Sequence, residues 1–182
     1  MRMQTDSDEP RRNSFCVWWH SVNVQIAIAA IGMSAGLMAG VVFAMQYQNW
    51  SAVTLCFTAL LFSTLLLHIH LAYKWQRILE WPTALFNSLI YFNTLACVIS
   101  LIGMVYCLVV AAIEGQGLTP EELKGNNLWI TAVWFFMTAK YAGLCVTSTR
   151  RYYSITREPL LLRPLGAPSA IIPQNEKAQL LI

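Results

Sequence analysis

Four apolar runs, each long enough to cross a lipid bilayer, constrain this chain more than any other feature of its sequence. They cover roughly residues 22–46, 51–73, 84–113 and 127–147. A transmembrane helix needs about 20 consecutive, mostly apolar residues, and each run reaches that length. The sequence therefore predicts an all-α membrane protein with four transmembrane helices.

The composition supports a membrane protein rather than a soluble one. Hydrophobic residues make up 57% of the 182-residue chain, charged residues make up only 12%, and the mean hydropathy is +0.50. A soluble domain carries about 25% charged residues, so this chain has too few charges to cover a water-facing surface. The five cysteines are odd in number and form no CxxC pair, which indicates neither a disulfide framework nor a zinc site.

The distribution of lysine and arginine predicts the orientation of the chain. Ten of these residues fall in the N-terminal tail, the 74–83 loop and the C-terminal tail, whereas only Lys124 falls on the opposite side. The positive-inside rule then places both termini in the cytosol. The predicted organisation is a cytosolic tail over 1–20, a transmembrane domain over 21–147 and a cytosolic tail over 148–182.

The first run carries a face of small residues. Gly32, Gly36 and Gly40 recur at four-residue spacing, which lets a neighbouring backbone approach closely. Two interpretations stay open at this point. The face packs inside the chain, or it is the contact between subunits of a homo-oligomer.

Polar side chains of three runs are expected at one depth in the membrane. At about 1.5 Å per residue, His68 and Lys140 both lie roughly 8–10 Å beneath the cytosolic interface. The third run adds a polar face at the same level, made of Asn87, Tyr91 and Thr94. Ionisable groups at membrane depth are costly and mark functional sites by default.

Simpler interpretations of these residues stay open. Lys140 extends to the lipid headgroups, and His68 only packs between helices. His70 points to another face and is expected to meet headgroups or loop.

Two basic and two aromatic residues follow the fourth run, as Arg150-Arg151-Tyr152-Tyr153. They fit a stop-transfer signal with interfacial anchors. They also fit a capture site for an anionic aromatic ligand, because arginine binds carboxylates bidentately and tyrosine can ligate ferric iron.

The end of the chain resembles an adaptor-read sorting signal, with an acidic residue four positions before a leucine pair: Glu176, Leu180 and Leu181. It predicts clathrin-adaptor-type sorting partners and an endosomal or lysosomal location, with a possible share at the plasma membrane.

The sequence contains no nucleophile elbow, HExxH motif, phosphate-binding loop or paired intramembrane carboxylates. We therefore expect no enzyme. The basic tail is too short and too close to the membrane to indicate nucleic-acid binding, so the expected surroundings are the lipid bilayer.

In the order and spacing of several residues, the chain resembles the haem-responsive (HRG) family of four-span haem transporters over roughly residues 20–157. The resemblance is carried by His68, Leu118-Thr119, Trp134, Lys140 and Arg150-Arg151-Tyr152. It implies transport of haem from the exoplasmic or endolysosomal lumen into the cytosol. Haem would be the transported ligand and not a permanent cofactor.

The resemblance also implies roles for individual residues. The family's membrane histidine falls on His68, which would be the axial ligand of the haem iron. The family's Phe-Ala-Arg-Lys-Tyr motif falls on residues 148–152, where serine replaces the leading phenylalanine. The family's loop histidine before the fourth run has no counterpart here. Haem offers a flat apolar ring and two propionates, and the expected contacts are Lys140, Arg150, Arg151, Tyr91, Tyr152 and Tyr153.

Two rival functions are compatible with the same residues. A lysosomal four-span adaptor would recruit cytosolic partners through its tail and transport nothing. A small cation channel is the other, although its outer mouth shows no acidic residues beyond Glu114, Glu121 and Glu122 in one loop.

Overall fold

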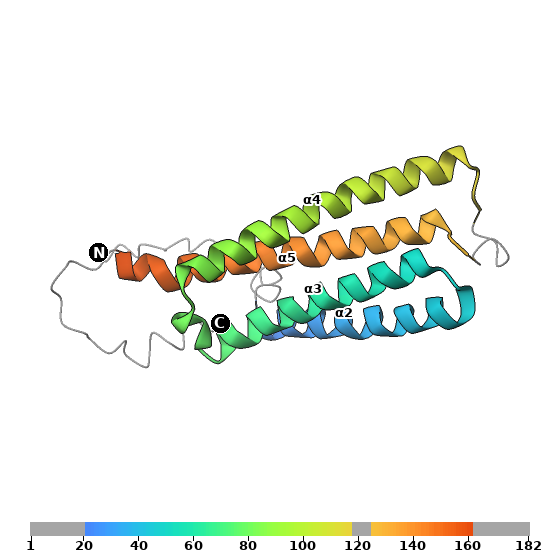
Figure 1. Cartoon of the computed structure of the whole chain (residues 1–182). Coiled ribbons are helices and arrows are strands. Elements are labelled where there is room, and N and C mark those ends of the chain that lie inside the picture. Colours follow the sequence, from blue (N-terminus) through green and yellow to red (C-terminus); the bar gives the residue numbers. More distant parts are fainter. Residues whose placement is uncertain (1–20, 118–124, 162–182) are drawn as a thin grey trace, which may run out of the picture.

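The computed structural model describes residues 21–117 and 125–161, and all of its long elements are helices (Figure 1). In chain order they are α2 (Val22–Val42), the π-helical turn η1 (Phe43–Tyr47), α3 (Trp50–Lys74), the 3-10 turn η2 (Arg77–Glu80), α4 (Thr83–Ile113) and α5 (Leu128–Leu161). Within the described ranges, four helices are long and apolar enough to cross a membrane. The predicted all-α fold with four transmembrane helices is confirmed.

Some expected features fall outside the described residues. They are the N-terminal tail over 1–20, the Leu118-Thr119 segment, and the sorting residues Glu176, Leu180 and Leu181.

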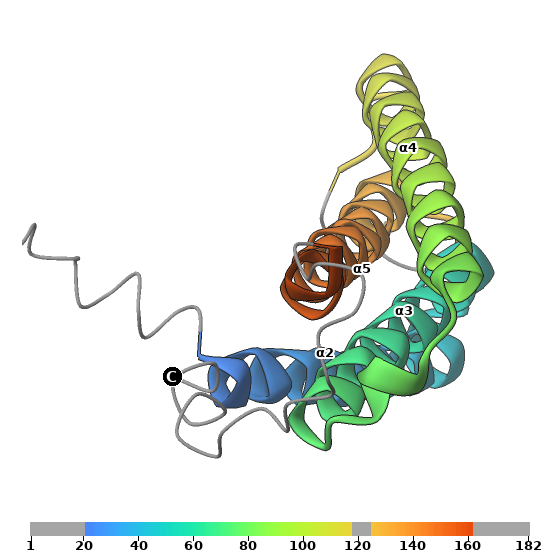
Figure 2. The same ribbon diagram turned by 90° about the vertical axis from the view of Figure 1, so that its left-hand side faces the viewer.

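The helices do not form a closed square bundle. α2 packs along α3, α3 packs along α5, and α5 packs along α4. Seen from the end where α2 begins, α2 and α4 form the two sides of an angle with α3 at its corner, and α5 lies inside the angle (Figure 2). The central pair, α3 and α5, consequently buries a larger share of its residues than α2 or α4 does.

The glycine face of α2 is used for packing inside the chain. Gly32, Gly36 and Gly40 are all buried. The Tyr141 ring of α5 occupies the space over Gly32, and a methyl group on Gly36 would lie 3.1 Å from the backbone carbonyl oxygen of Cys56 in α3. The interpretation of this face as a subunit contact is therefore wrong, and a homo-oligomer would have to use another surface.

The last helix is longer than hydropathy predicts. α5 continues through the expected boundary at residue 147 to Leu161, so it has 34 residues and extends past the other helices (Figure 1). Hydropathy falls after residue 147, but no glycine or proline interrupts the chain before Pro159. A hydropathy window marks only the apolar part of a helix. The segment expected as the start of a tail is instead a helical extension, which carries Arg150 to Tyr153 on a rigid element.

Polar contacts join α3 and α5 at the end of the bundle opposite this extension. Asn49 caps α3, its side-chain oxygen accepting from the Ala52 N–H at 3.1 Å, and its amide donates to the Asn127 carbonyl at 3.3 Å. The hydroxyls of Ser51 and Thr131 lie 2.9 Å apart. These contacts hold the two helices together at what the positive-inside rule predicts to be the outer end.

We expect Gly36→Ala to lower the melting temperature of the purified protein in detergent, because the added methyl group meets the backbone of α3. Overpacking of this kind costs about 1–3 kcal/mol. Gly143→Ala is the matched control, since its methyl group would meet only the Cys97 sulfur at 3.8 Å. That change should hold or raise the melting temperature. Equal effects of the two substitutions would contradict close packing at Gly36.

Candidate functional site

Three helices surround a cavity of about 440 Å³ at the end of the bundle where α2 begins and α3 ends. Its volume lies within the range of about 300–1,000 Å³ that is usual for small-molecule sites. We call it the α2–α3–α5 cavity. Its lining residues are Gln25 and Ile28 from α2, Leu66 and His70 from α3, and Lys140, Leu144, Thr147, Ser148 and Arg151 from α5.

Helical periodicity explains why these residues meet. Of the five residues from α5, Lys140, Leu144, Ser148 and Arg151 recur at intervals of three or four, and Thr147 lies four residues before Arg151. Leu66 and His70 are also four apart, so each set occupies one face of its helix. The α5 set spans the boundary at residue 147. The cavity wall therefore depends on the continuation of α5 beyond its apolar part.

His70 lies at the centre of the polar contacts around the cavity. Its side chain is only 2% exposed, and its Nδ1 lies 2.7 Å from the hydroxyl of Tyr152, which is 1% exposed. The Tyr152 ring stacks on Tyr73, with ring centroids 4.0 Å apart and planes 7° apart. The prediction that His70 meets headgroups or loop is wrong, because the extension of α5 covers it.

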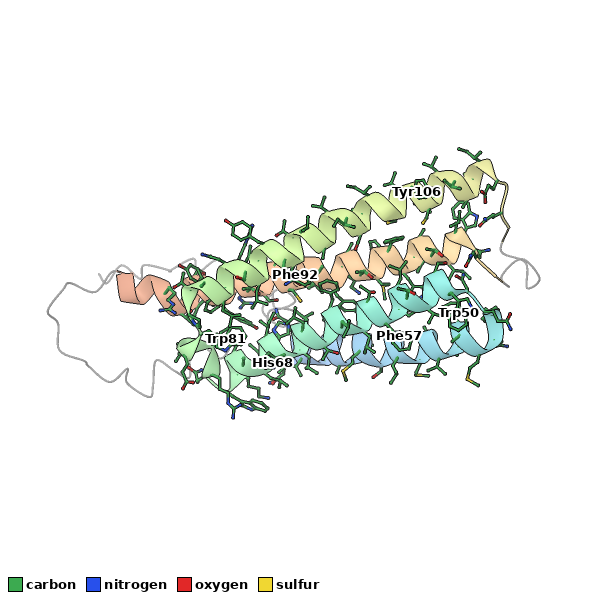
Figure 3. All side chains as sticks on the ribbon, in the orientation of Figure 1. Trp50, Phe57, His68, Trp81, Phe92 and Tyr106 are labelled. Atoms are coloured by element: carbon green, nitrogen blue, oxygen red, sulfur yellow. The ribbon has the colours of Figure 1, made fainter. Side chains whose placement is uncertain are left out.

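His68 lies elsewhere. It is exposed, and its ring stacks on Trp81, with centroids 6.0 Å apart and planes 17° apart. Figure 3 shows the two side chains next to each other near the end of α3. Arg157 of α5 fixes the backbone of Trp81, because its guanidinium donates a hydrogen bond to the Trp81 carbonyl at 2.7 Å. The structure does not place His68 in the wall of the cavity.

The structure brings together only part of the expected site. Lys140 and Arg151 line the cavity, and Tyr152 reaches it through His70. Arg150 is exposed on α5 outside the lining. Tyr153 packs edge-to-face against another aromatic side chain, Phe86, at 5.3 Å. Tyr91 is 76% exposed on α4 and takes no part in the cavity.

Sequence reasoning missed His70 and Gln25, and it did not place Thr147 or Ser148 in the cavity wall either. His70 and His68 are two positions apart, so they point to different sides of α3, but periodicity does not say which side faces α5. Gln25 is the second polar side chain of the first apolar run, after Asn23. Its place inside an apolar run was the available signal.

The cavity is positively charged and suits an anionic ligand. Its lining contains the cations Lys140 and Arg151, and no carboxylate of residues 21–117 or 125–161 belongs to it. The Lys140 ammonium lies 5.3 Å from the centroid of the Tyr141 ring, a contact that offsets part of the cost of its depth. Among the described residues, no group of three or more His, Cys, Asp or Glu side chains could hold a bare metal ion. A single imidazole beside two cations instead suits a ligand that brings its own metal and its own anionic groups.

Comparisons with known proteins agree with this chemistry. Residues 87–140 match the family model described as "Haem-transporter, endosomal/lysosomal, haem-responsive gene". The chain is 50% identical to the heme transporter hrg-1 of Caenorhabditis elegans over 159 residues, which cover 86% of this chain and 82% of that protein. It is 32% identical to the heme transporter hrg-6 of the same organism over 140 residues, 77% of this chain and 87% of that protein.

No solved structure matches the chain. The relatives are named as transporters and not as enzymes, in agreement with a sequence that carries no catalytic motif. The extent and identity of the match to hrg-1 decide the family. The chain belongs to the haem-responsive (HRG) family of multi-pass membrane proteins.

Proposed function

We propose that this protein carries haem from the exoplasmic or endolysosomal lumen into the cytosol, and that the α2–α3–α5 cavity holds haem on its way. The names of its relatives support haem as the cargo. The observation that carries the proposal is an imidazole in the wall of a cavity to which the described part of the chain contributes two cations and no carboxylate.

The cavity matches the three chemical parts of haem. The haem iron takes an axial ligand, the macrocycle is flat and apolar, and the two propionates are anionic. His70 engages Tyr152 through Nδ1, and its Nε2 has no hydrogen-bond partner among the described residues, so Nε2 is the nitrogen for the iron. Leu66 and Leu144 supply apolar contacts for the macrocycle. Lys140 and Arg151 supply charge for the propionates.

This proposal moves the axial ligand from His68 to His70. The family resemblance implies His68, but that side chain is stacked on Trp81 away from the cavity. His68, Arg150, Tyr91 and Tyr153 stay predicted haem contacts only for steps outside this cavity, before haem enters it or after haem leaves it.

The direction of transport is part of the proposal. The cavity lies at the end of the bundle that carries Lys74, Arg77 and Arg151, which the positive-inside rule assigns to the cytosol. At the other end, Asn49 and Ser51 bond across to α5. A site next to the cytosolic end, with the outer end held together, is the arrangement expected of a protein about to release its cargo inward.

We expect His70→Ala to weaken haemin binding by at least about tenfold, because the axial ligand is lost. The measurement is the Soret shift of haemin titrated into the purified protein in detergent. His68→Ala makes the same change two residues away and should bind as the wild type does. Weaker binding by His68→Ala together with normal binding by His70→Ala would identify His68 as the axial ligand. Normal binding by both variants would exclude both histidines.

The role of Lys140 can be separated from packing by changing the ligand. Lys140→Met keeps an unbranched apolar stem and removes the charge, so binding of haemin should fall about tenfold, the value of one charge-assisted hydrogen bond. Haemin dimethyl ester has no propionate charge, and its affinity should be the same for both proteins. An equal loss with the ester would show that Lys140 acts through packing.

We also propose that the protein resides in endosomes or lysosomes and is directed there by clathrin-adaptor-type machinery. The support is the acidic-dileucine pattern of Glu176, Leu180 and Leu181.

Replacing both leucines, in the double variant Leu180→Ala and Leu181→Ala, should move the protein to the plasma membrane. Surface biotinylation of cells that express the variant measures this shift. Haemin titration of the purified variant is the control and should be unchanged. A surface fraction equal to that of the wild type would contradict the sorting role.

A further inference from the structure

A short chain of polar contacts connects three helices behind the proposed iron ligand. Nδ1 of His70 in α3 lies 2.7 Å from the Tyr152 hydroxyl of α5. The same hydroxyl lies 3.4 Å from the side-chain oxygen of Gln25 in α2. His70 and Gln25 both line the cavity, and Tyr152 connects them.

The protons available to this chain determine the tautomer of His70. A tyrosine hydroxyl has one proton to donate, and an amide oxygen only accepts. If Tyr152 donated to His70 Nδ1, the Gln25 oxygen would receive nothing from it and the imidazole proton would sit on Nε2. If His70 donates from Nδ1 to Tyr152, the hydroxyl is free to donate to Gln25 and both contacts become hydrogen bonds.

Only the second arrangement leaves a lone pair on Nε2. A neutral imidazole carries one proton, and the nitrogen without it is the one that ligates a metal. The stacking of Tyr152 on Tyr73, with planes 7° apart, holds the hydroxyl in place between its two neighbours. The Gln25 oxygen on α2 therefore decides which nitrogen of His70 carries the proton, and it leaves the lone pair on Nε2.

We propose that Gln25 is a positioning residue that, through Tyr152, holds His70 in the tautomer whose Nε2 binds the haem iron. This inference rests on the proposed function and adds a residue to it. Hydrogen bonds to the remote nitrogen of a ligating histidine fix the ring and raise its basicity, and their loss typically costs about 10–100-fold in metal affinity.

The test compares two substitutions at Gln25 with a matched control. Gln25→Leu removes the acceptor, and haemin should bind about tenfold more weakly. Gln25→Glu keeps an acceptor at the same place and should retain binding. Asn23→Leu is the control, because Asn23 also lies on α2 but accepts from Lys74 at 3.0 Å, away from the cavity.

A spectroscopic measurement separates positioning from a loss of packing. Resonance Raman spectra of the ferrous haem complex report the iron–imidazole stretch, which depends on how strongly Nδ1–H is hydrogen-bonded. This band should move to lower frequency in Gln25→Leu and stay or rise in Gln25→Glu. Wild-type affinity together with an unmoved band in Gln25→Leu would overturn the proposal.

Tyr152→Phe tests the same proposal if Gln25→Leu does not fold. It removes the hydroxyl and keeps the ring that stacks on Tyr73. The iron–imidazole band should again move to lower frequency and haemin should bind more weakly, and an unchanged complex would overturn the proposal. Where both variants fold, the double variant should bind haemin as Tyr152→Phe does, because the two residues act through one chain of bonds. Additive losses would overturn the proposal. Absence of haemin binding by the wild type would remove the proposed function itself.

Discussion

The contact between His70 and Tyr152 joins the polar extension of α5 to the end of α3, beside the cavity that His70 lines. A 2.7 Å hydrogen bond and the stack on Tyr73 fix the two helices where the sequence turns from apolar to basic. A second aromatic contact, Tyr153 against Phe86 of α4 with ring centroids 5.3 Å apart, also holds the extension against the bundle. Arg151 is thus carried on the same helix face as Lys140, and both cations border one space.

Most of the fold could be predicted from the sequence, because the bilayer leaves few choices for a long apolar run. The four apolar runs predicted the four helices, and the spacing of Gly32, Gly36 and Gly40 predicted close packing of the first helix against a neighbour. The partner of that contact could not be predicted, because spacing marks a small-residue face and does not say which helix fills it. The end of α5 was also missed, because a helix can continue after its hydropathy has fallen.

The candidate site was predicted in part. Lys140 and Arg151 were expected and do line the cavity, because a charge at depth needs a polar environment. His68 was preferred to His70 first for its depth beside Lys140 and then for its place in the family resemblance, whereas the structure places His70 in the wall of the cavity. Two residues on one helix differ in direction by a fixed angle, but the sequence has no marker for the side from which α5 approaches. Gln25 lines the cavity from α2 and contacts Tyr152, a partner 127 positions away that no local sequence pattern indicates.

The single straight α5 connects the two ends of the molecule mechanically. Thr131 near its start is bonded to Ser51, and Arg151 lies twenty residues further along, roughly 30 Å away at 1.5 Å per residue. The same helix is joined to α3 again at that second level, because Tyr152 contacts His70 and stacks on Tyr73. The Ser51–Thr131 and His70–Tyr152 contacts thus tie α5 to α3 at two levels, and together they set the spacing of the two helices that carry the cavity wall.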